Sequence, residues 1–157
     1  MKQAKNFKES LNSERFLLTA GLTPPKGVNI EEFRMAIEAL RGRVDAIVVY
    51  DSRSAMIHLG GMACALIVKE CGIEPILSIS CRDRNRIAIC SDLLGAYVHG
   101  VMNILCVTGD FLSFGDARDS KCVYDLDSVQ AIDMIRKMEK GIDAGGNKLD
   151  GKFLLLS

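Results

Sequence analysis

Residues 75–110 of the chain read PILSISCRDRNRIAICSDLLGAYVHGVMNILCVTGD and contain one complete strand–helix–strand unit. The apolar segment 75–80 predicts a strand, and the polar segment 81–86 leads from it into a helix that ends at Gly100. A second apolar segment, 103–108, predicts another strand. Two strands joined by a helix in this way lie parallel in one sheet.

The same order of elements repeats upstream. Apolar segments at 16–22 and 46–50 predict two more strands, and Gly42 ends the helix between them. Asn29 and Glu32 stand three residues apart, as in a capping box, so this helix is expected to begin at Asn29.

The second helix is predicted over about 54–71. It contains Gly60 and Gly61, and each glycine weakens a helix by roughly 1 kcal/mol relative to alanine, which indicates close packing or a break there. His58 and His99 both fall within predicted helices, away from the ends of strands, so neither is expected to be catalytic.

A longer loop, 111–126, separates the fourth strand from the fourth helix. Asp127 is expected to cap that helix together with Gln130. The apolar run 153–156 then predicts a fifth strand that begins at about Lys152.

Four strand–helix units and one further strand indicate an α/β protein that matches the first half of a (βα)8 barrel of the TIM type. A doubly wound dinucleotide-binding fold is the alternative, but no Gly-x-Gly-x-x-Gly follows the first strand. We therefore divide the chain into a polar N-terminal extension, 1–15, and a partial barrel domain, 16–157. A half-barrel exposes two unpaired strand edges, so we expect self-association or pairing with a complementing C-terminal half.

Charge and apolar content exclude several classes of protein. The 157 residues carry 20 basic and 20 acidic side chains, without the basic stripe of a nucleic-acid-binding protein. No apolar run is long enough to cross a membrane, and the N-terminal residues are polar, so we expect a cytoplasmic protein with neither a nucleic-acid nor a membrane partner. Six cysteines without a Cys-x-x-Cys pair favour reduced core thiols, and no metal site is expected.

Functional groups of a (βα)8 barrel lie where its strands end. Thr108, Gly109 and Asp110 stand at the end of the predicted fourth strand. The glycine would let a ligand approach the backbone, and the carboxylate would accept hydrogen bonds from that ligand. A simple turn with a solvated aspartate is the alternative.

The ends of the second and third strands are equally open to two interpretations. Tyr50 would stack on a ligand ring or pack within the sheet, and Asp51 and Ser78 would line a site or only face one side of it. Segment 81–86 holds three arginines and an aspartate. It would either bind a phosphorylated metabolite or begin a capped helix with surface ion pairs.

Five segments together resemble the methylenetetrahydrofolate reductase family. They occur in the family's order and cover nearly the whole chain: TAGLTPPKG (19–27), SCRDRNR (80–86), SDLLGA (91–96), VTGD (107–110) and YDLDSV (124–129).

The resemblance implies a flavoprotein that holds FAD at the carboxyl ends of the barrel strands. NAD(P)H would reduce the flavin, and the flavin would reduce the folate substrate, 5,10-methylenetetrahydrofolate, to 5-methyltetrahydrofolate. By position, Asp110 would lie near flavin and folate and would be catalytic. The cofactor-binding residues would be Tyr50, Asp51, Ser78, Thr108, Gly109, Asp110, Tyr124 and Asp125.

Two positions depart from the family. The family has a glutamate that acts as a general acid where this chain has Gly21, and a general acid contributes roughly 10²–10⁴-fold in rate. Tyr50 replaces a small hydroxyl residue, and its bulk would crowd the flavin ring. The family's remaining strands and most of its folate site would follow Ser157. We therefore expect either a reductase with impaired folate turnover or a non-catalytic half-barrel that binds flavin or a partner protein.

Overall fold

The computed structural model describes residues 7–13, 15–153 and 155 of the chain. The strands are β1 (Thr19–Leu22), β2 (Ala46–Val49), β3 (Glu74–Ser80) and β4 (Asn103–Val107). The helices are α1 (Phe7–Leu11), α2 (Glu31–Leu40), α3 (Gly61–Glu70), α4 (Arg86–Val98) and α5 (Ser128–Glu139). Two short 3₁₀ turns, η1 (Arg53–Ala55) and η2 (Leu112–Phe114), follow β2 and β4.

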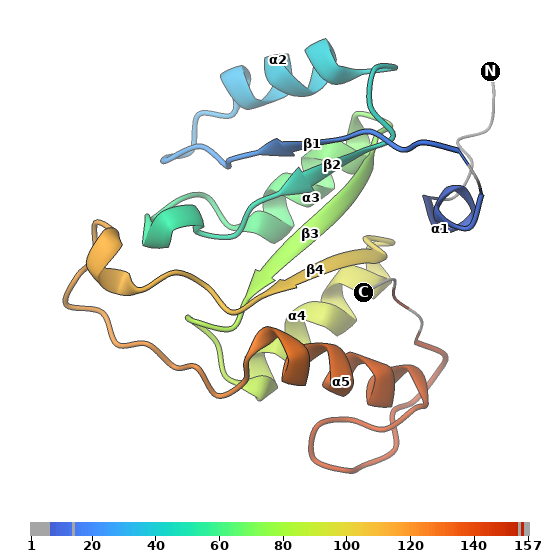
Figure 1. The fold of residues 1–157 in the computed structure, drawn as a ribbon, viewed down its shortest axis with the longest axis vertical. Coiled ribbons are helices and arrows are strands. Elements are labelled where there is room, and N and C mark those ends of the chain that lie inside the picture. The colour runs from blue at the N-terminus through green and yellow to red at the C-terminus, as the bar shows by residue number, and fades with distance from the viewer. Residues whose placement is uncertain (1–6, 14, 154, 156–157) are drawn as a thin grey trace.

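The four strands form one parallel sheet in the order β1-β2-β3-β4 (Figure 1). A helix connects each strand to the next, which confirms the predicted α/β class and parallel sheet. Within the described residues the strand order never reverses, as it does at the centre of a doubly wound sheet. This order is consistent with part of a TIM-type barrel, while closure into a barrel stays a prediction.

One face of the sheet and the helices that cover it form the hydrophobic core. Alternate strand residues such as Ile47, Leu77 and Ile104 are buried there. They pack against Val68 of α3 and Leu93 of α4 in the same cluster, and Figure 1 shows both helices behind the strands. The alternation explains why the strands could be predicted from their apolar residues.

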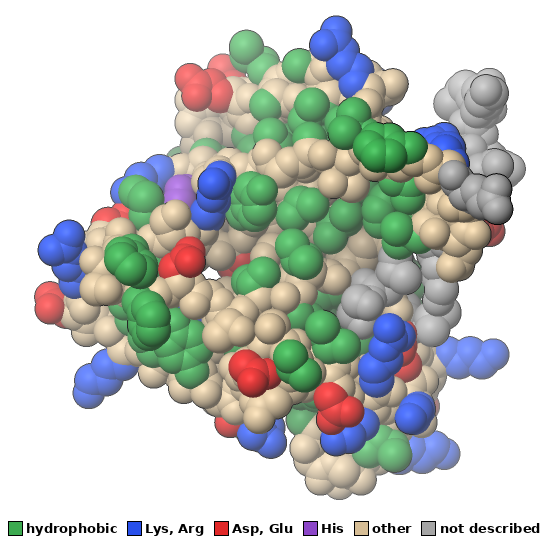
Figure 2. Space-filling model, in the orientation of Figure 1, with side chains coloured by type: hydrophobic (Ala, Val, Ile, Leu, Met, Phe, Trp, Pro, Cys, Tyr) green, Lys and Arg blue, Asp and Glu red, His purple; other side chains and the backbone are tan. Residues whose placement is uncertain are grey.

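The opposite face of the sheet is only partly covered. Register places Gly21, Val48 and Ile76 in one row across this face, and Ser78 pairs with Leu105 in the next row. Gly21 is exposed and Leu105 is 40% exposed. Figure 2 shows hydrophobic side chains gathered over the strands on the side turned to the viewer. This surface would be the interior of a closed barrel.

Several predicted helices and strands begin at other residues in the structure. β1 begins at Thr19 rather than residue 16, because β2 begins opposite Thr19, at Ala46, and offers residues 16–18 no partner strand. The predicted capping box of α2 does not form: Ile30 precedes the helix, and the Asn29 side chain accepts a hydrogen bond from the Glu31 N–H at 3.0 Å.

The helix predicted over 54–71 begins only at Gly61. The N–H of Ser54 donates to the Asp110 carboxylate and that of Ile57 to the Asp116 carboxylate, both at 3.0 Å, so neither is available for a helix. Gly60 and Gly61 therefore stand at the beginning of α3, and His58 lies in the loop before it.

The last helix and the chain end give mixed outcomes. The predicted capping box of α5 is confirmed, since Asp127 accepts from the Gln130 N–H at 2.7 Å and donates its own N–H to the Gln130 side chain at 3.0 Å. Phe153 and Leu155, from the predicted fifth strand, are buried but belong to no assigned strand. Residues 154 and 156 of that prediction lie outside the described part of the chain.

Candidate functional site

A pocket of about 290 Å³ lies at the carboxyl ends of β2, β3 and β4. Its lining residues are Tyr50, Asp51, Ser52, Arg53, Ser78, Arg82, Leu105, Val107, Gly109 and Asp110. Five of the eight predicted site residues are among them: Tyr50, Asp51, Ser78, Gly109 and Asp110. Ligands of α/β proteins bind at the carboxyl ends of the strands of a parallel sheet. Both the position of the pocket and the residues that line it therefore agree with the predicted site.

Asp51 connects the end of β2 to the end of β3. Its carboxylate is buried and accepts a hydrogen bond from the Ser80 N–H at 2.9 Å. Two Arg84 nitrogens donate to the same carboxylate at 2.6 and 3.3 Å, and Arg84 also pairs with Asp92 at 2.9 Å. The Asp51 charge is therefore neutralised and serves to fix the two strand ends.

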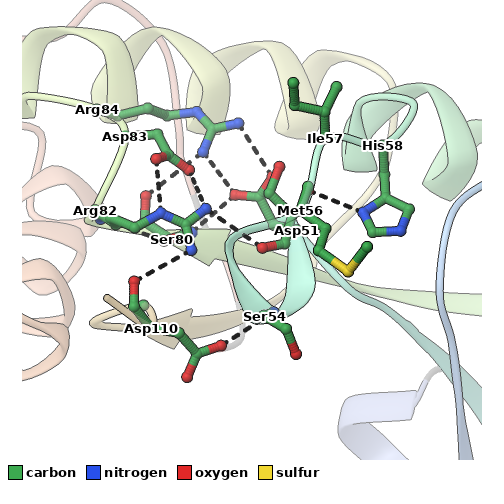
Figure 3. A network of polar contacts seen from close by, with 12 residues as sticks. Asp51, Ser54, Met56, Ile57, His58, Ser80, Arg82, Asp83, Arg84 and Asp110 are labelled. Atoms are coloured by element: carbon green, nitrogen blue, oxygen red, sulfur yellow. Dashed lines mark hydrogen bonds and ion pairs between the residues drawn. The ribbon is translucent and has the colours of Figure 1, made fainter. Parts of the chain in front are cut away.

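Arg82 lines the pocket and connects the loops after β2, β3 and β4. Its side chain is 3% exposed and forms a two-point ion pair with Asp83 at 2.7 and 2.6 Å (Figure 3). The same guanidinium donates to the carbonyl oxygens of Ser52 at 3.3 Å and Asp110 at 3.4 Å. The hydrogen bond to Asp83 raises the pKa of Arg82, so the group stays charged. The buried arginine thus sets the spacing between the loops after β2 and β4.

Asp110 is the exposed carboxylate at the rim of the pocket. It accepts a hydrogen bond from the Ser54 N–H at 3.0 Å, and no cation of the described residues pairs with it. An unpaired carboxylate beside a pocket remains able to accept hydrogen bonds from a ligand.

The structure requires a glycine at position 109 whether or not a ligand binds. Its φ of 98° favours glycine, and an added Cβ would lie 2.7 Å from the Cβ of Arg82. The predicted approach of a ligand to this backbone is therefore not needed to explain the residue.

The loop after β2 has an unusual backbone. Ser52, Ser54 and Ala55 all have positive φ, between 43° and 58°, a region that costs non-glycine residues of order 1–3 kcal/mol each. Asp110 binds the Ser54 N–H, and Gly115 packs against Ala55 so closely that it has no space for a Cβ. The loop after β4 therefore maintains the conformation of the loop after β2.

The remaining three predicted site residues are engaged elsewhere. The Thr108 hydroxyl faces α5, where it donates to the Ser128 hydroxyl at 3.3 Å and accepts from the Ser128 N–H at 3.2 Å. The Tyr124 hydroxyl lies within 3.3 Å of the carbonyl oxygens of Gly109 and Asp110, so it supports the loop after β4.

Asp125 forms a two-point ion pair with Arg86 at 2.8 and 2.9 Å. The Arg86 side chain and N–H lower the pKa of Asp125 to about 2. Its carboxylate therefore connects the start of α4 to the loop before α5, and the pocket lining does not include it.

The three arginines of segment 81–86 do not form a free anion site. Arg82 pairs with Asp83, Arg84 with Asp51 and Asp92, and Arg86 with Asp125. The N-cap of α4 is Asn85, whose side chain accepts from the Ala88 N–H at 3.0 Å. The structure thus favours the capped helix with ion pairs over the phosphate site.

Five lining residues are not among the eight predicted site residues: Ser52, Arg53, Arg82, Leu105 and Val107. Leu105 and Val107 alternate with Gly109 along β4 and its end, so the period of the strand could have indicated them. Ser52 and Arg53 follow Asp51 at the end of β2, and Arg82 belongs to segment 81–86, so their positions at strand ends were a signal for all three.

Other classes of site find no support in the part of the chain that is described. No group of three or more metal-ligating side chains converges among these residues. No described helix has the length and apolar character needed to span a membrane. Five of the six cysteines are buried or half-buried, as predicted for core thiols, but Cys122 is exposed.

The fold and the pocket define an α/β protein with a pocket at the carboxyl edge of a parallel sheet. A family model described as methylenetetrahydrofolate reductase matches residues 6–151, and the chain therefore belongs to that family. Membership confirms the resemblance and associates the chain with oxidoreductases of folate-dependent one-carbon metabolism. A search of curated proteins gives no match.

Proposed function

We propose that this chain takes part in the flavin-dependent reduction of 5,10-methylenetetrahydrofolate to 5-methyltetrahydrofolate by NAD(P)H. The observation that supports the proposal is the pocket at the ends of β2, β3 and β4. Five predicted site residues line this pocket, and the chain belongs to the family from which they were predicted. A cytoplasmic location is part of the proposal.

The lining residues suit a flat, partly polar ring. Leu105 and Val107 offer an apolar wall, while Ser78 and Asp110 offer polar groups at other points of the pocket. A volume of about 290 Å³ is just below the roughly 300–1,000 Å³ of ligand pockets, so the pocket would take the ring system of FAD and not the whole dinucleotide.

Each residue then has a role of its own. FAD, when bound, would supply the hydride transfer between the nicotinamide and folate. Asp110 would accept a hydrogen bond from the bound ligand, since its carboxylate has no cation partner among the described residues. Asp51 and Arg82 would keep the loops at the spacing that the pocket needs, and Thr108, Tyr124 and Asp125 would act through the loops that they support.

The test is a visible absorption spectrum of the purified chain after addition of FAD and desalting. A retained flavin spectrum is expected, and Asp110→Ala should lower the amount retained. A colourless protein would contradict the proposal that this pocket binds flavin.

A non-catalytic role is the second candidate, and one observation favours it. The face with Gly21 and Leu105 is partly exposed, so the described sheet has a surface on which a further part of the same polypeptide, a second copy or another protein would pack. Retained flavin with no reduction by NAD(P)H would favour this candidate over the reductase.

A further inference from the structure

Gly21 in β1 leaves a space that the side chain of Tyr50 fills. A Cβ added to Gly21 would lie 2.6 Å from Cζ of Tyr50, 2.8 Å from its Cε2, and closer still to its hydroxyl oxygen. Real Cβ atoms essentially never approach a heavy atom within 3.0 Å. No side chain therefore fits at position 21 while Tyr50 has this orientation.

The backbone gives no other reason for a glycine at this position. Gly21 does not have a positive φ, unlike Gly42 and Gly109. It lies in a strand, where glycine has no side chain to pack. Its three nearest neighbours in the direction of a Cβ are all atoms of Tyr50. The identity of residue 21 is therefore explained by the residue at position 50.

Tyr50 is held from a second direction as well. The guanidinium carbon of Arg53 lies 5.0 Å from the centroid of the Tyr50 ring, within the range of a cation–π contact. The ring lines the pocket together with Ser78 and Leu105. Tyr50 is half-buried, and its hydroxyl has no hydrogen-bond partner among the described residues, whereas that of Tyr124 has two carbonyl oxygens within reach. Tyr50 thus brings an unused donor to the β1 side of the pocket.

We infer that Gly21 and Tyr50 act as one unit that determines which ligand the pocket accepts. Gly21 provides the space, and the Tyr50 hydroxyl donates a hydrogen bond to an acceptor atom of a planar heteroaromatic ligand. This inference rests on the proposed function, in which that ligand is the flavin ring. It assigns Tyr50 as a specificity-determining residue and makes position 21 dependent on it.

The first experiment compares FAD binding to the wild-type chain, Tyr50→Phe and Tyr97→Phe. Tyr50→Phe keeps the ring and loses the donor, so its Kd should rise about 2- to 10-fold, and the absorption bands of the bound flavin should shift. Tyr97→Phe is the matched control, because Tyr97 lies in α4, where its ring is 5.4 Å from that of Phe153. It should leave both the Kd and the bands unchanged.

The second experiment is a double-mutant cycle on the same Kd. Gly21→Ala should weaken FAD binding at least as much as Tyr50→Phe, because the methyl group displaces the phenol. In a Tyr50→Ser background the same change should alter Kd less than twofold. The displaced atoms are the far end of one side chain, so circular dichroism should show that Gly21→Ala remains folded.

The outcomes separate this inference from the proposed function. If Tyr50→Phe changed the Kd for FAD less than twofold, or if the effects in the cycle were additive, the role of the pair would be overturned. The proposed flavin site would be unaffected by that result. A wild-type chain that binds no FAD would contradict both.

Discussion

Replacement of Asp51 by alanine should destabilise the protein by about 3 kcal/mol, because two groups lose their partner. The buried Ser80 N–H would have no acceptor, which costs roughly 1–3 kcal/mol. Arg84 would lose its shorter ion pair but keep Asp92 at 2.9 Å, and its side chain is 27% exposed. The total therefore falls at the low end of the roughly 3–5 kcal/mol for a broken buried pair.

The assay is urea unfolding, together with a thermal scan. For a chain of this length, about 3 kcal/mol corresponds to a fall in Tm of roughly 6–12 °C. Asp51→Asn keeps an acceptor for the Ser80 N–H and should cost less than Asp51→Ala. Asp92→Ala is the matched control, because its carboxylate is 45% exposed, and it should cost under about 1 kcal/mol. If Asp51→Ala were no more destabilising than Asp92→Ala, the reasoning that Asp51 fixes the ends of β2 and β3 would be refuted.

Two further predictions concern Asp125 and Gly115. Arg86 lowers the pKa of Asp125 from 3.8 to about 2, so the unfolded chain takes up this proton first. The associated stability is present above about pH 4 and is lost as pH falls towards 2; Asp125→Asn should remove this part of the acid-induced decline in urea unfolding. Gly115→Ala should destabilise by about 1–3 kcal/mol in a thermal scan, since the new Cβ would overlap the backbone of Ala55. Gly95→Ala in α4 should instead stabilise by about 1 kcal/mol, because the added Cβ would meet no atom beyond its own stretch of helix within 4 Å. A Gly115→Ala protein as stable as wild type, or an acid decline unchanged in Asp125→Asn, would contradict these two arguments.

The strands were predictable because their signal is local. The segments that contain β2, β3 and β4 are apolar runs with residues buried against helices, and glycines such as Gly42 and Gly100 follow the helices between strands with a positive φ. The loop before α3 was not predictable, because its backbone N–H groups bind Asp110 and Asp116, which lie 56 and 59 residues away in the sequence. A long-range hydrogen bond of this kind overrides local helix propensity.

The candidate site follows the same division. Position at a strand end correctly grouped Tyr50, Asp51 and Ser78 with the loop after β4. It could not show that the Asp125 carboxylate is paired with Arg86, 39 residues away, nor that Thr108 faces α5. Membership of a loop is encoded locally, whereas the direction of a side chain depends on partners that the fold supplies.

The resemblance suggests two separate departures from the family, at Gly21 and at Tyr50. On the sequence alone, the first would remove an acid and the second would crowd the flavin ring. In the structure the two positions are sterically coupled, because the Tyr50 phenol occupies the space that a side chain at position 21 requires. Gly21→Glu alone should therefore not place a carboxylate in this site, since the new side chain would meet Tyr50. Only Gly21→Glu combined with Tyr50→Ser gives the carboxylate room, and a gain in folate turnover should depend on both changes together.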